Sequence, residues 1–261
     1  MTASVRQKDG VIEPGNRTSW HIRVGVRFPN WRVVRSERAV AALIARLALH
    51  DFAERWWDYA AIEDVIRTTI LRHFAKHGRA PTVDNLRDAV GVPADEVRQS
   101  LHRLRARDLV VFDTAEDRIT GAYPFSDRDT GHRVRFLDGL TVNAMCAIDA
   151  LGAGAMCGRD AAIESRCKSC GAAVHVVTAE HGYALHSHAP ADAVVWSSLN
   201  YADGCGATSS CASTSFFCSE EHLQEWLAGR HPDVRGHCLS IEEAHEIGVA
   251  IFSPMLATAS S

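Results

Sequence analysis

The residues best suited to chemistry lie near the middle of the chain, where Cys146 and Asp149 are three positions apart. Asn143 precedes them and can cap a helix, which predicts a helix with Cys146 as its third residue. Residues three apart share one helix face, so the thiol and the carboxyl would look into the same space. Free amide hydrogens and the helix dipole stabilise a thiolate in a first turn, and an acid one turn away can supply a proton. The spacing indicates a thiolate beside a proton donor; a buried thiol next to a solvated carboxylate is the alternative.

The composition indicates the class of protein that contains the Cys146–Asp149 pair. The chain has 261 residues, of which 46% are hydrophobic and 23% are charged, as is typical of globular proteins. Its net charge of −4 gives no overall positive charge that would attract nucleic acid. No apolar run approaches the ~18 residues of a membrane span, and residues 1–15 lack the core of a signal peptide. We therefore expect a cytoplasmic protein with no membrane partner. Eight cysteines in that compartment indicate metal binding or thiol chemistry rather than disulfides.

The first half of the chain predicts a scaffold of two parts. Residues 1–59 form an N-terminal extension, with a loose tail over 1–19, an edge strand within 21–28 and a helix over 37–59. Residues 60–125 predict a helical winged-helix domain. Its expected elements are helices over 61–77, 82–90 and 94–107 and two strands over 109–112 and 118–123.

The predicted winged helix carries arginines that could meet phosphates. These are Arg98, Arg103, Arg105 and Arg107, but acidic residues interleave with them. A solvated helix face explains this pattern at least as well as a DNA footprint. Nucleic acid is therefore not expected as a partner.

The second half, residues 126–261, predicts the catalytic domain, and all eight cysteines lie in it. A polar linker over 123–131 leads into a strand and turn at 136–140. A glycine- and serine-rich loop over 201–210 delivers Cys211. The remaining expected elements are strands over 173–178, 183–187, 193–198 and 237–240, and helices over 220–228 and 241–247, the last stopped by Gly248. The overall fold class is α+β, with a mixed or antiparallel sheet.

Several stretches together resemble the organomercurial lyase (alkylmercury lyase) family. A first set, from His132 to Cys167, is ungapped, and a second set follows Ser210. The resemblance covers residues 60–250, beyond the N-terminal extension. The matched stretches are Phe136-Leu137-Asp138-Gly139, Cys146-Ala147-Ile148-Asp149-Ala150-Leu151, Gly158-Arg159, Cys167, Ser210-Cys211 with Phe216-Phe217, and Ser240 to Gly248.

The resemblance implies a lyase of mercury resistance and detoxification. Cys146 and Cys211 would both bind the metal of an R–Hg⁺ substrate, since mercury(II) is soft and prefers thiolates. Asp149 would protonate the leaving carbon and release R–H, with Hg²⁺ left on the cysteine pair. No organic cofactor is implied, and the product would pass to low-molecular-weight thiols or to a mercuric reductase. Two alternatives stay open: an enzyme of the same fold with a non-mercury substrate, and a winged-helix regulator that senses a soft metal.

A second group of cysteines predicts a structural zinc site. Cys167-x-x-Cys170 has the spacing of a zinc knuckle, and Cys218-x-x-x-His222 lies at a strand-to-helix junction. The treble-clef-like fold of the resembled family's catalytic half would bring these four residues together. Buried thiols and a surface histidine are the alternative.

Overall fold

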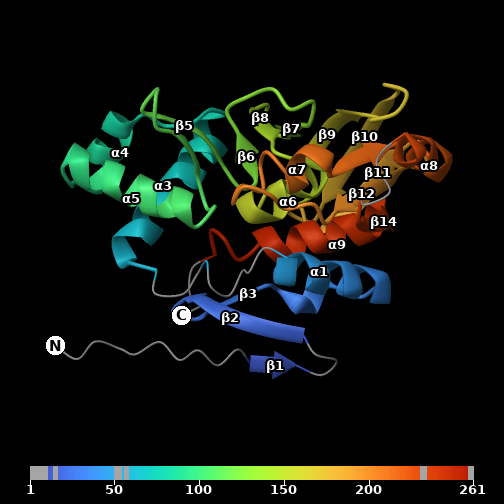
Figure 1. Cartoon of the computed structure of the whole chain (residues 1–261), viewed down its shortest axis with the longest axis horizontal. Coiled ribbons are helices and arrows are strands. Elements are labelled where there is room, and N and C mark those ends of the chain that lie inside the picture. Colours follow the sequence, from blue (N-terminus) through green and yellow to red (C-terminus); the bar gives the residue numbers. More distant parts are fainter. Residues whose placement is uncertain (1–10, 14–16, 50–54, 56–58, 230–233, 258–261) are drawn as a thin grey trace.

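The computed structural model describes residues 11–13, 17–49, 55, 59–229 and 234–257. Figure 1 shows the main sheet and helix α6 on one side of helix α9, with helix α1 and a small N-terminal sheet on the other side. The helices α3, α4 and α5 lie at one end. No helix in the described ranges is long and apolar enough to cross a membrane.

The main sheet has eight strands, and every neighbouring pair in it is antiparallel. Their order across the sheet is β11-β10-β9-β7-β8-β6-β5-β4. The bounds are β4 Val111–Asp113, β5 Arg118–Ala122, β6 Phe125–Ser126, β7 Arg133–Phe136, β8 Thr141–Ala144, β9 Ala161–Arg166, β10 Ala173–Ala179 and β11 Ala184–Ala189. The α+β class and the antiparallel sheet are thereby confirmed.

The sheet continues through the segment that the sequence predicts as a linker. β6 lies within residues 123–131 and pairs with β5 on one side and with β8 on the other. The linker prediction is therefore wrong, because backbone pairing joins the two halves there. The division into domains 1–59, 60–125 and 126–261 stays a prediction.

Two apolar helices, α6 (Ala147–Cys157) and α9 (Ile241–Phe252), cross at the centre of the molecule. A Cβ on Gly152 would overlap the carbonyl oxygen of Gly248, so the two glycines allow this close approach. The sequence predicts that Gly248 ends the last helix after residue 247. It instead lies inside α9, which continues to Phe252 because its apolar face packs on α6.

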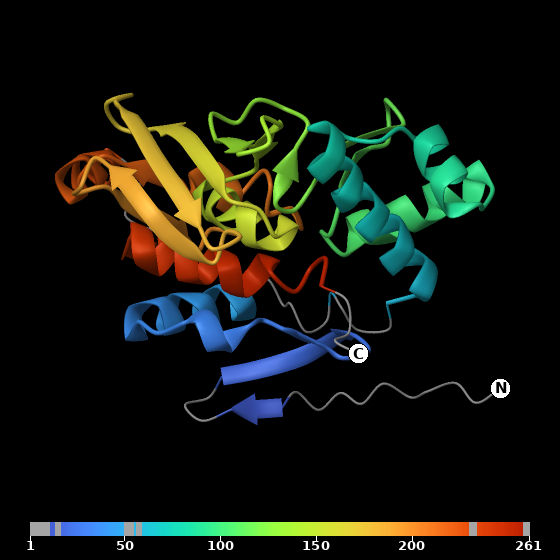
Figure 2. The ribbon, with the colours of Figure 1, turned by 180° about the vertical axis from the view of Figure 1, so that it is seen from behind.

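The N-terminal extension covers the outer face of α9 (Figure 2). Its helix α1 (Glu37–Leu49) confirms the predicted helix in its first half, while most of residues 50–58 lie outside the described part of the chain. A three-stranded sheet of β1 (Val11–Glu13), β2 (Arg17–Arg23) and β3 (Val26–Phe28) precedes a short 3₁₀ turn at Trp31–Val33. The predicted single edge strand is thus a hairpin that turns at Gly25, whose φ is +73°. The expected loose tail in part forms β1 and the start of β2.

The helical part of the scaffold matches its predicted bounds closely. It comprises α3 (Ala61–His77), α4 (Val83–Val90) and α5 (Ala94–Ala106), followed by the hairpin of β4 and β5. Gly78 ends α3 in a left-handed conformation, and the Thr82 side chain caps α4. These boundaries depend on local caps, which explains why the sequence predicts them well.

The last part of the fold is a small sheet in the order β13-β12-β14. Its strands are β12 (Val194–Ser198), β13 (Ser215–Phe217) and β14 (Gly236–Ser240). The short helix α7 (Ser210–Ser213) precedes β13, and α8 (Glu220–Ala228) follows it. This arrangement places Cys211 and Cys218 at opposite ends of one short segment.

Candidate active site

Cys146 lies at the junction of strand β8 and helix α6. Asn143 belongs to β8, where it pairs with β6 and β7, so the prediction that it caps the helix is wrong. Cys146 is itself the cap: its backbone is extended, and its sulfur accepts a hydrogen bond from the Asp149 amide at 3.5 Å. Strand pairing that runs to Ala144 moves the helix start to Ala147. The thiol therefore lies directly at the free amides of the helix terminus.

The structure brings Cys146, Asp149 and Cys211 together. Their ligand atoms all lie within 4.8 Å of one another. The Cys211 thiol donates a hydrogen bond to Asp149 Oδ2 at 3.6 Å. The predicted glycine- and serine-rich loop leads into the short helix α7, which carries Cys211, and the Cys211 amide donates to the Gly206 carbonyl oxygen. All three side chains are at most 4% exposed, so they form a group shielded from water.

The two sulfurs of this group differ in acidity. Burial opposes ionisation of Cys146, but the hydrogen bond from Cys211, the charge of Arg46 and the hydrogen bonds from Asp149 outweigh it and lower the Cys146 pKa to about 6. The hydrogen bond to Cys146 and burial raise the Cys211 pKa well above its ordinary value. At neutral pH the group therefore holds one thiolate and one thiol.

The surroundings of Asp149 favour its neutral form. Burial is the main cause that raises its pKa well above the ordinary value, and the neighbouring Cys146 charge adds to the effect. The positive charge of Arg46 opposes this rise in pKa without cancelling it. A carboxyl in this state can donate a proton near neutral pH.

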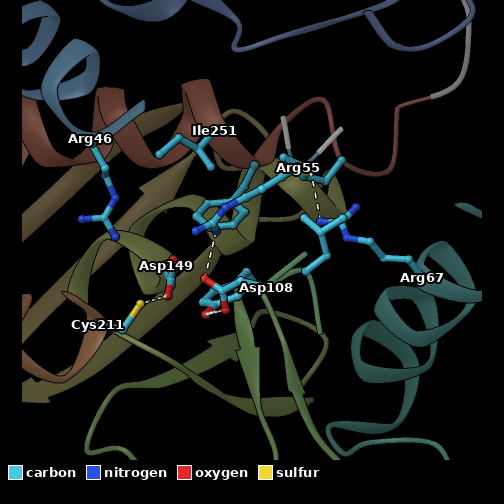
Figure 3. A pocket seen from close by; sticks show the side chains of 11 residues that line it. Arg46, Arg55, Arg67, Asp108, Asp149, Cys211 and Ile251 are labelled. Atoms are coloured by element: carbon cyan, nitrogen blue, oxygen red, sulfur yellow. Dashed lines mark hydrogen bonds and ion pairs between the residues drawn. The ribbon is translucent and has the colours of Figure 1, made fainter. Parts of the chain in front are cut away.

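Arg46 is a part of the site that sequence reasoning misses. It lies on α1, is 5% exposed, and its Nη1 has no hydrogen-bond partner among the described residues. Figure 3 shows its guanidinium pointing toward Asp149 and Cys211. The signal is present in the sequence, because Arg46 interrupts the apolar face formed by Leu43 and Leu47. A cation at an inward position of an amphipathic helix indicates a buried anion nearby.

Asp108 is a second missed residue, and it anchors the segment that leads to Cys211. Its carboxylate accepts hydrogen bonds from the Tyr123 hydroxyl at 2.8 Å, the Tyr201 hydroxyl at 3.2 Å and the Gly206 amide at 2.9 Å. It also pairs with Arg55 at 2.9 Å and is 4% exposed. This network ties the end of α5 to the backbone just before α7.

A small cavity of about 40 Å³ opens onto the group. Asp149 and Cys211 line it on one side, and Arg46 and Ile251 line it on another (Figure 3). Phe252 also contributes to the lining. One water needs ~10–15 Å³ by the same measure, so the cavity accommodates only a few heavy atoms. Cys146 is not among the residues that line this cavity.

The four residues of the predicted zinc site form a separate group. The ligand atoms of Cys167, Cys170, Cys218 and His222 also lie within 4.8 Å of one another. The eight cysteines thus include two clusters, one buried around Asp149 and one partly exposed around His222.

Comparison with known proteins gives a consistent set of similarities. Residues 125–253 match the protein family described as MerB, alkylmercury lyase. The alkylmercury lyase of Staphylococcus epidermidis (strain ATCC 12228 / FDA PCI 1200) is 32% identical over 181 residues, which cover 69% of this chain and 77% of that protein. Those of Bacillus cereus and Clostridium butyricum are each 29% identical over 178 residues, covering 66% of this chain and 73% of theirs.

A solved structure shares the fold. The mercury-bound form of MerB2 superposes with a TM-score of 0.68 at 23% identity, covering 83% of this chain and 100% of that chain. The similarity extends beyond the part matched by the family and includes much of the N-terminal half.

Proposed function

This chain belongs to the alkylmercury lyase family, enzymes that cleave the carbon–mercury bond, and we propose that it does so by protonolysis with Cys146, Cys211 and Asp149. The substrate is an R–Hg⁺ cation, and the products are R–H and Hg²⁺. The observation that carries the proposal is the convergence of two thiols and one neutral carboxyl in a single buried group.

The first step is capture of the substrate by Cys146. Mercury(II) is a soft metal with a strong preference for thiolates, and Cys146 is the sulfur with the lowered pKa. Its attack forms a neutral R–Hg–S species, which suits a site shielded from water. The Cys211 sulfur, which lies in the same group, is then available as a second ligand of this mercury.

The second step moves two protons and breaks the carbon–mercury bond. Asp149 gives its proton to the carbon, the carbon–mercury bond breaks, and R–H leaves. The Cys211 sulfur bonds to mercury, and its proton passes to the Asp149 carboxylate along the existing contact to Oδ2. The balance is one R–H released, one Hg²⁺ bound by two thiolates, and Asp149 again neutral.

Arg46 acts as a positioning residue for the charges of this reaction. It does not need to touch the substrate, because its positive charge already lies near Cys146, Cys211 and Asp149. The charge stabilises the Cys146 thiolate in a buried site where an unpaired anion would be costly.

Product release requires thiols from outside the site. Two solvent thiolates can exchange with Cys146 and Cys211 and carry the Hg²⁺ away, either as a free complex or to a mercuric reductase. The chain's eight free cysteines suit a reducing compartment, which supports a cytoplasmic location.

We also infer that two parts of the scaffold have recognised architectures. The helices α4 and α5 with the β4–β5 hairpin support a winged-helix unit, and the β9–β10 turn facing the β13–α8 junction supports a treble-clef-like unit. The winged-helix unit serves as a scaffold rather than a DNA reader, because Arg98 pairs with Asp117 and Arg103 pairs with Glu63.

The decisive experiment separates binding from turnover in Asp149→Asn. Purified wild-type protein with methylmercury or phenylmercury and excess thiol should release methane or benzene, followed by gas chromatography. The variant should still bind the organomercurial through the Cys146 thiolate but turn over ~10²–10⁴-fold more slowly, because the proton donor is lost. Cys146→Ser should neither bind tightly nor cleave.

Cys157→Ser is the matched control, since Cys157 belongs to neither cluster, and it should cleave at the wild-type rate. Wild-type turnover by Asp149→Asn would show that the proton comes from elsewhere. A wild-type protein that binds organomercurials without releasing hydrocarbon would favour a soft-metal sensor instead.

A further inference from the structure

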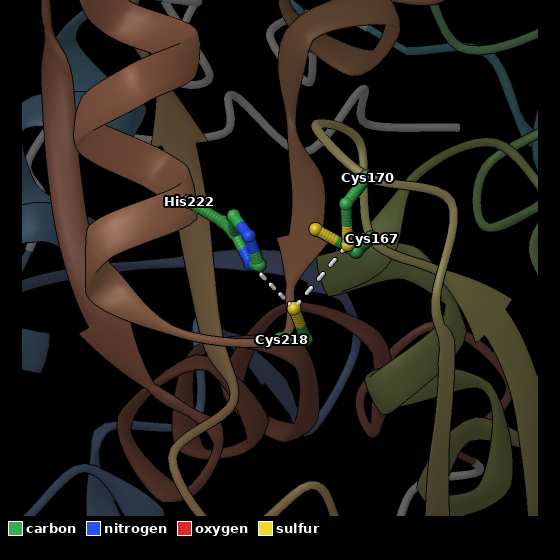
Figure 4. A group of neighbouring side chains, drawn as sticks. All are labelled: Cys167, Cys170, Cys218 and His222. Atoms are coloured by element: carbon green, nitrogen blue, oxygen red, sulfur yellow. Dashed lines mark hydrogen bonds between the residues drawn. The ribbon is translucent and has the colours of Figure 1, made fainter.

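The second cysteine cluster joins two backbone segments that are distant in the sequence (Figure 4). Cys167 and Cys170 lie in the turn between β9 and β10, while Cys218 and His222 lie where β13 meets α8. Figure 4 shows their side chains pointing toward a common centre.

The cluster has the size of a tetrahedral metal site. Cys170 Sγ lies 3.6 Å from Cys218 Sγ, and Cys218 Sγ lies 2.8 Å from His222 Nδ1. Zinc–sulfur bonds of about 2.3 Å in a tetrahedron place two sulfurs about 3.8 Å apart. A metal ion would therefore need only small side-chain adjustments.

The backbone holds these ligands before any metal arrives. The turn is closed by the Gly171 amide, which donates to the Cys167 carbonyl oxygen at 2.9 Å, and Gly171 has the left-handed φ of +75° that this turn requires. The Lys168 amide donates to the Phe216 carbonyl oxygen at 3.0 Å and so joins the turn to β13. Preorganised ligands on two paired segments are typical of a structural zinc site.

The surrounding core is too small to explain this convergence by packing. Among the described residues, only four buried side chains make up the apolar cluster at this end, and partly buried ones such as Trp226 and Leu227 pack against it. The four are Cys167, Trp196, Phe217 and Leu223. Cys170 is exposed, so its sulfur adds little buried apolar surface. Small apolar clusters of this kind gain stability from a metal that cross-links their segments.

We propose that Cys167, Cys170, Cys218 and His222 bind one Zn²⁺ in a closed tetrahedral site. Three thiols release their protons to solvent as the ion binds, and the four protein ligands leave no position for a substrate. The site is therefore structural. It fixes Cys218, which follows the short strand β13 that begins just after Cys211 and α7, and so supports the position of the second mercury ligand.

The test uses the full chain, purified under reducing conditions and never exposed to mercury. Elemental analysis of the wild-type protein should give about one zinc per chain, and Cys170→Ser should reduce this severalfold. Cys238→Ser and Cys146→Ser should keep the wild-type zinc content, since both lie outside this cluster. Little zinc in wild-type protein, even after incubation with excess Zn²⁺, would overturn the proposal, as would loss of zinc in Cys146→Ser.

A second measurement covers the case in which Cys170→Ser folds poorly. Wild-type protein loaded with Co²⁺ should show the intense visible absorption of tetrahedral cobalt with thiolate-to-metal charge transfer, and one equivalent of Zn²⁺ should abolish it. The weak spectrum of octahedral cobalt would contradict a closed thiolate site. Removal of zinc with a chelator should also lower the thermal midpoint of wild-type protein, and an unchanged midpoint would contradict a structural role.

Discussion

At the scale of single residues, the reactivity of Cys146 depends on a balance between burial and neighbouring charge. Burial favours the neutral thiol, whereas Arg46 and the hydrogen bonds from Cys211 and Asp149 favour the thiolate. The same burial keeps Asp149 protonated. One shielded environment therefore moves the two pKa values in opposite directions and favours the thiolate and the neutral carboxyl that the proposed reaction needs.

Replacing Arg46 with methionine should raise the Cys146 pKa, because the nearest positive charge is removed while burial persists. The acidic limb of the kcat/KM profile against pH should move to higher pH. Activity at a fixed pH below this limb should fall about tenfold for each pH unit that the limb moves. Arg46→Lys should return the limb part of the way toward its wild-type position.

Arg38→Met, an exposed position on the same helix, is the control for this experiment and should leave the profile unchanged. An unchanged pH profile in Arg46→Met would show that the charge of Arg46 does not set the Cys146 pKa.

The pH dependence of the wild-type enzyme should be bell-shaped. Activity should rise with pH through about 6, because in the proposed mechanism the Cys146 thiol loses its proton to bind mercury. It falls again at higher pH as Asp149 loses the proton that it must donate, since the Asp149 pKa is raised. Single-turnover rates across the pH range measure both limbs. The residual rate of Asp149→Asn should lack the alkaline fall, and a fall that persists there would assign that limb to another group.

At the scale of elements, the site depends on the close crossing of α6 and α9. Cys146 and Asp149 are at the start of α6, so any displacement of that helix moves both. Gly152 faces Gly248 at the crossing, with the Phe252 ring beside them. A side chain at this point would push against backbone, which cannot move out of the way as a flexible side chain can.

Gly152→Ala should therefore destabilise the protein, although alanine favours helices. Overpacking costs about 1–3 kcal/mol, which corresponds to roughly 2–10 °C in thermal midpoint for a chain of this size. Gly229→Ala is the control, because its φ is −82° and the nearest atoms lie 3.8 Å from the added Cβ. Calorimetry should show a lower midpoint for the first variant only. Equal midpoints would mean that the helices can separate freely.

At the scale of the whole molecule, Asp108 connects three parts of the chain. It follows α5, accepts a hydrogen bond from Gly206 before α7, and pairs with Arg55 from the N-terminal part. Tyr123 extends the network, since its hydroxyl accepts from the Ala207 amide at 2.8 Å. The helical scaffold thereby positions the backbone that carries Cys211.

Asp108→Ala should cost stability and turnover together. It leaves the Arg55 charge and several donors buried without their acceptor, and breaking a buried pair in this way costs about 3–5 kcal/mol. Chemical denaturation and the single-turnover rate measure the two effects. Asp95→Ala, which removes an exposed pair with Arg98, should behave as wild type. Full activity in a destabilised Asp108→Ala would show that Cys211 is positioned without this network.

The sequence by itself determined that Cys146 and Asp149 lie together at one helix start, and it determined the boundaries of several helices. The spacing of Cys146 and Asp149 places both groups at the first turn of one helix, and their convergence with Cys211 agrees with the family resemblance. The bounds of α3, α4 and α8 follow from caps such as Gly78, Thr82 and Ser219. These signals act within a few residues of the chain, so they can be read without the rest of the protein.

The tertiary structure decided what depends on distant partners. Because Asn143 pairs within the sheet, Cys146 is the cap of α6. Because Gly248 packs against Gly152, α9 continues past Gly248. Arg46 and Asp108 lie at the site although they belong to separate parts of the N-terminal half. None of these outcomes follows from local preference, because the energy of strand pairing, of close helix contact or of a buried charge is set by residues tens or hundreds of positions away.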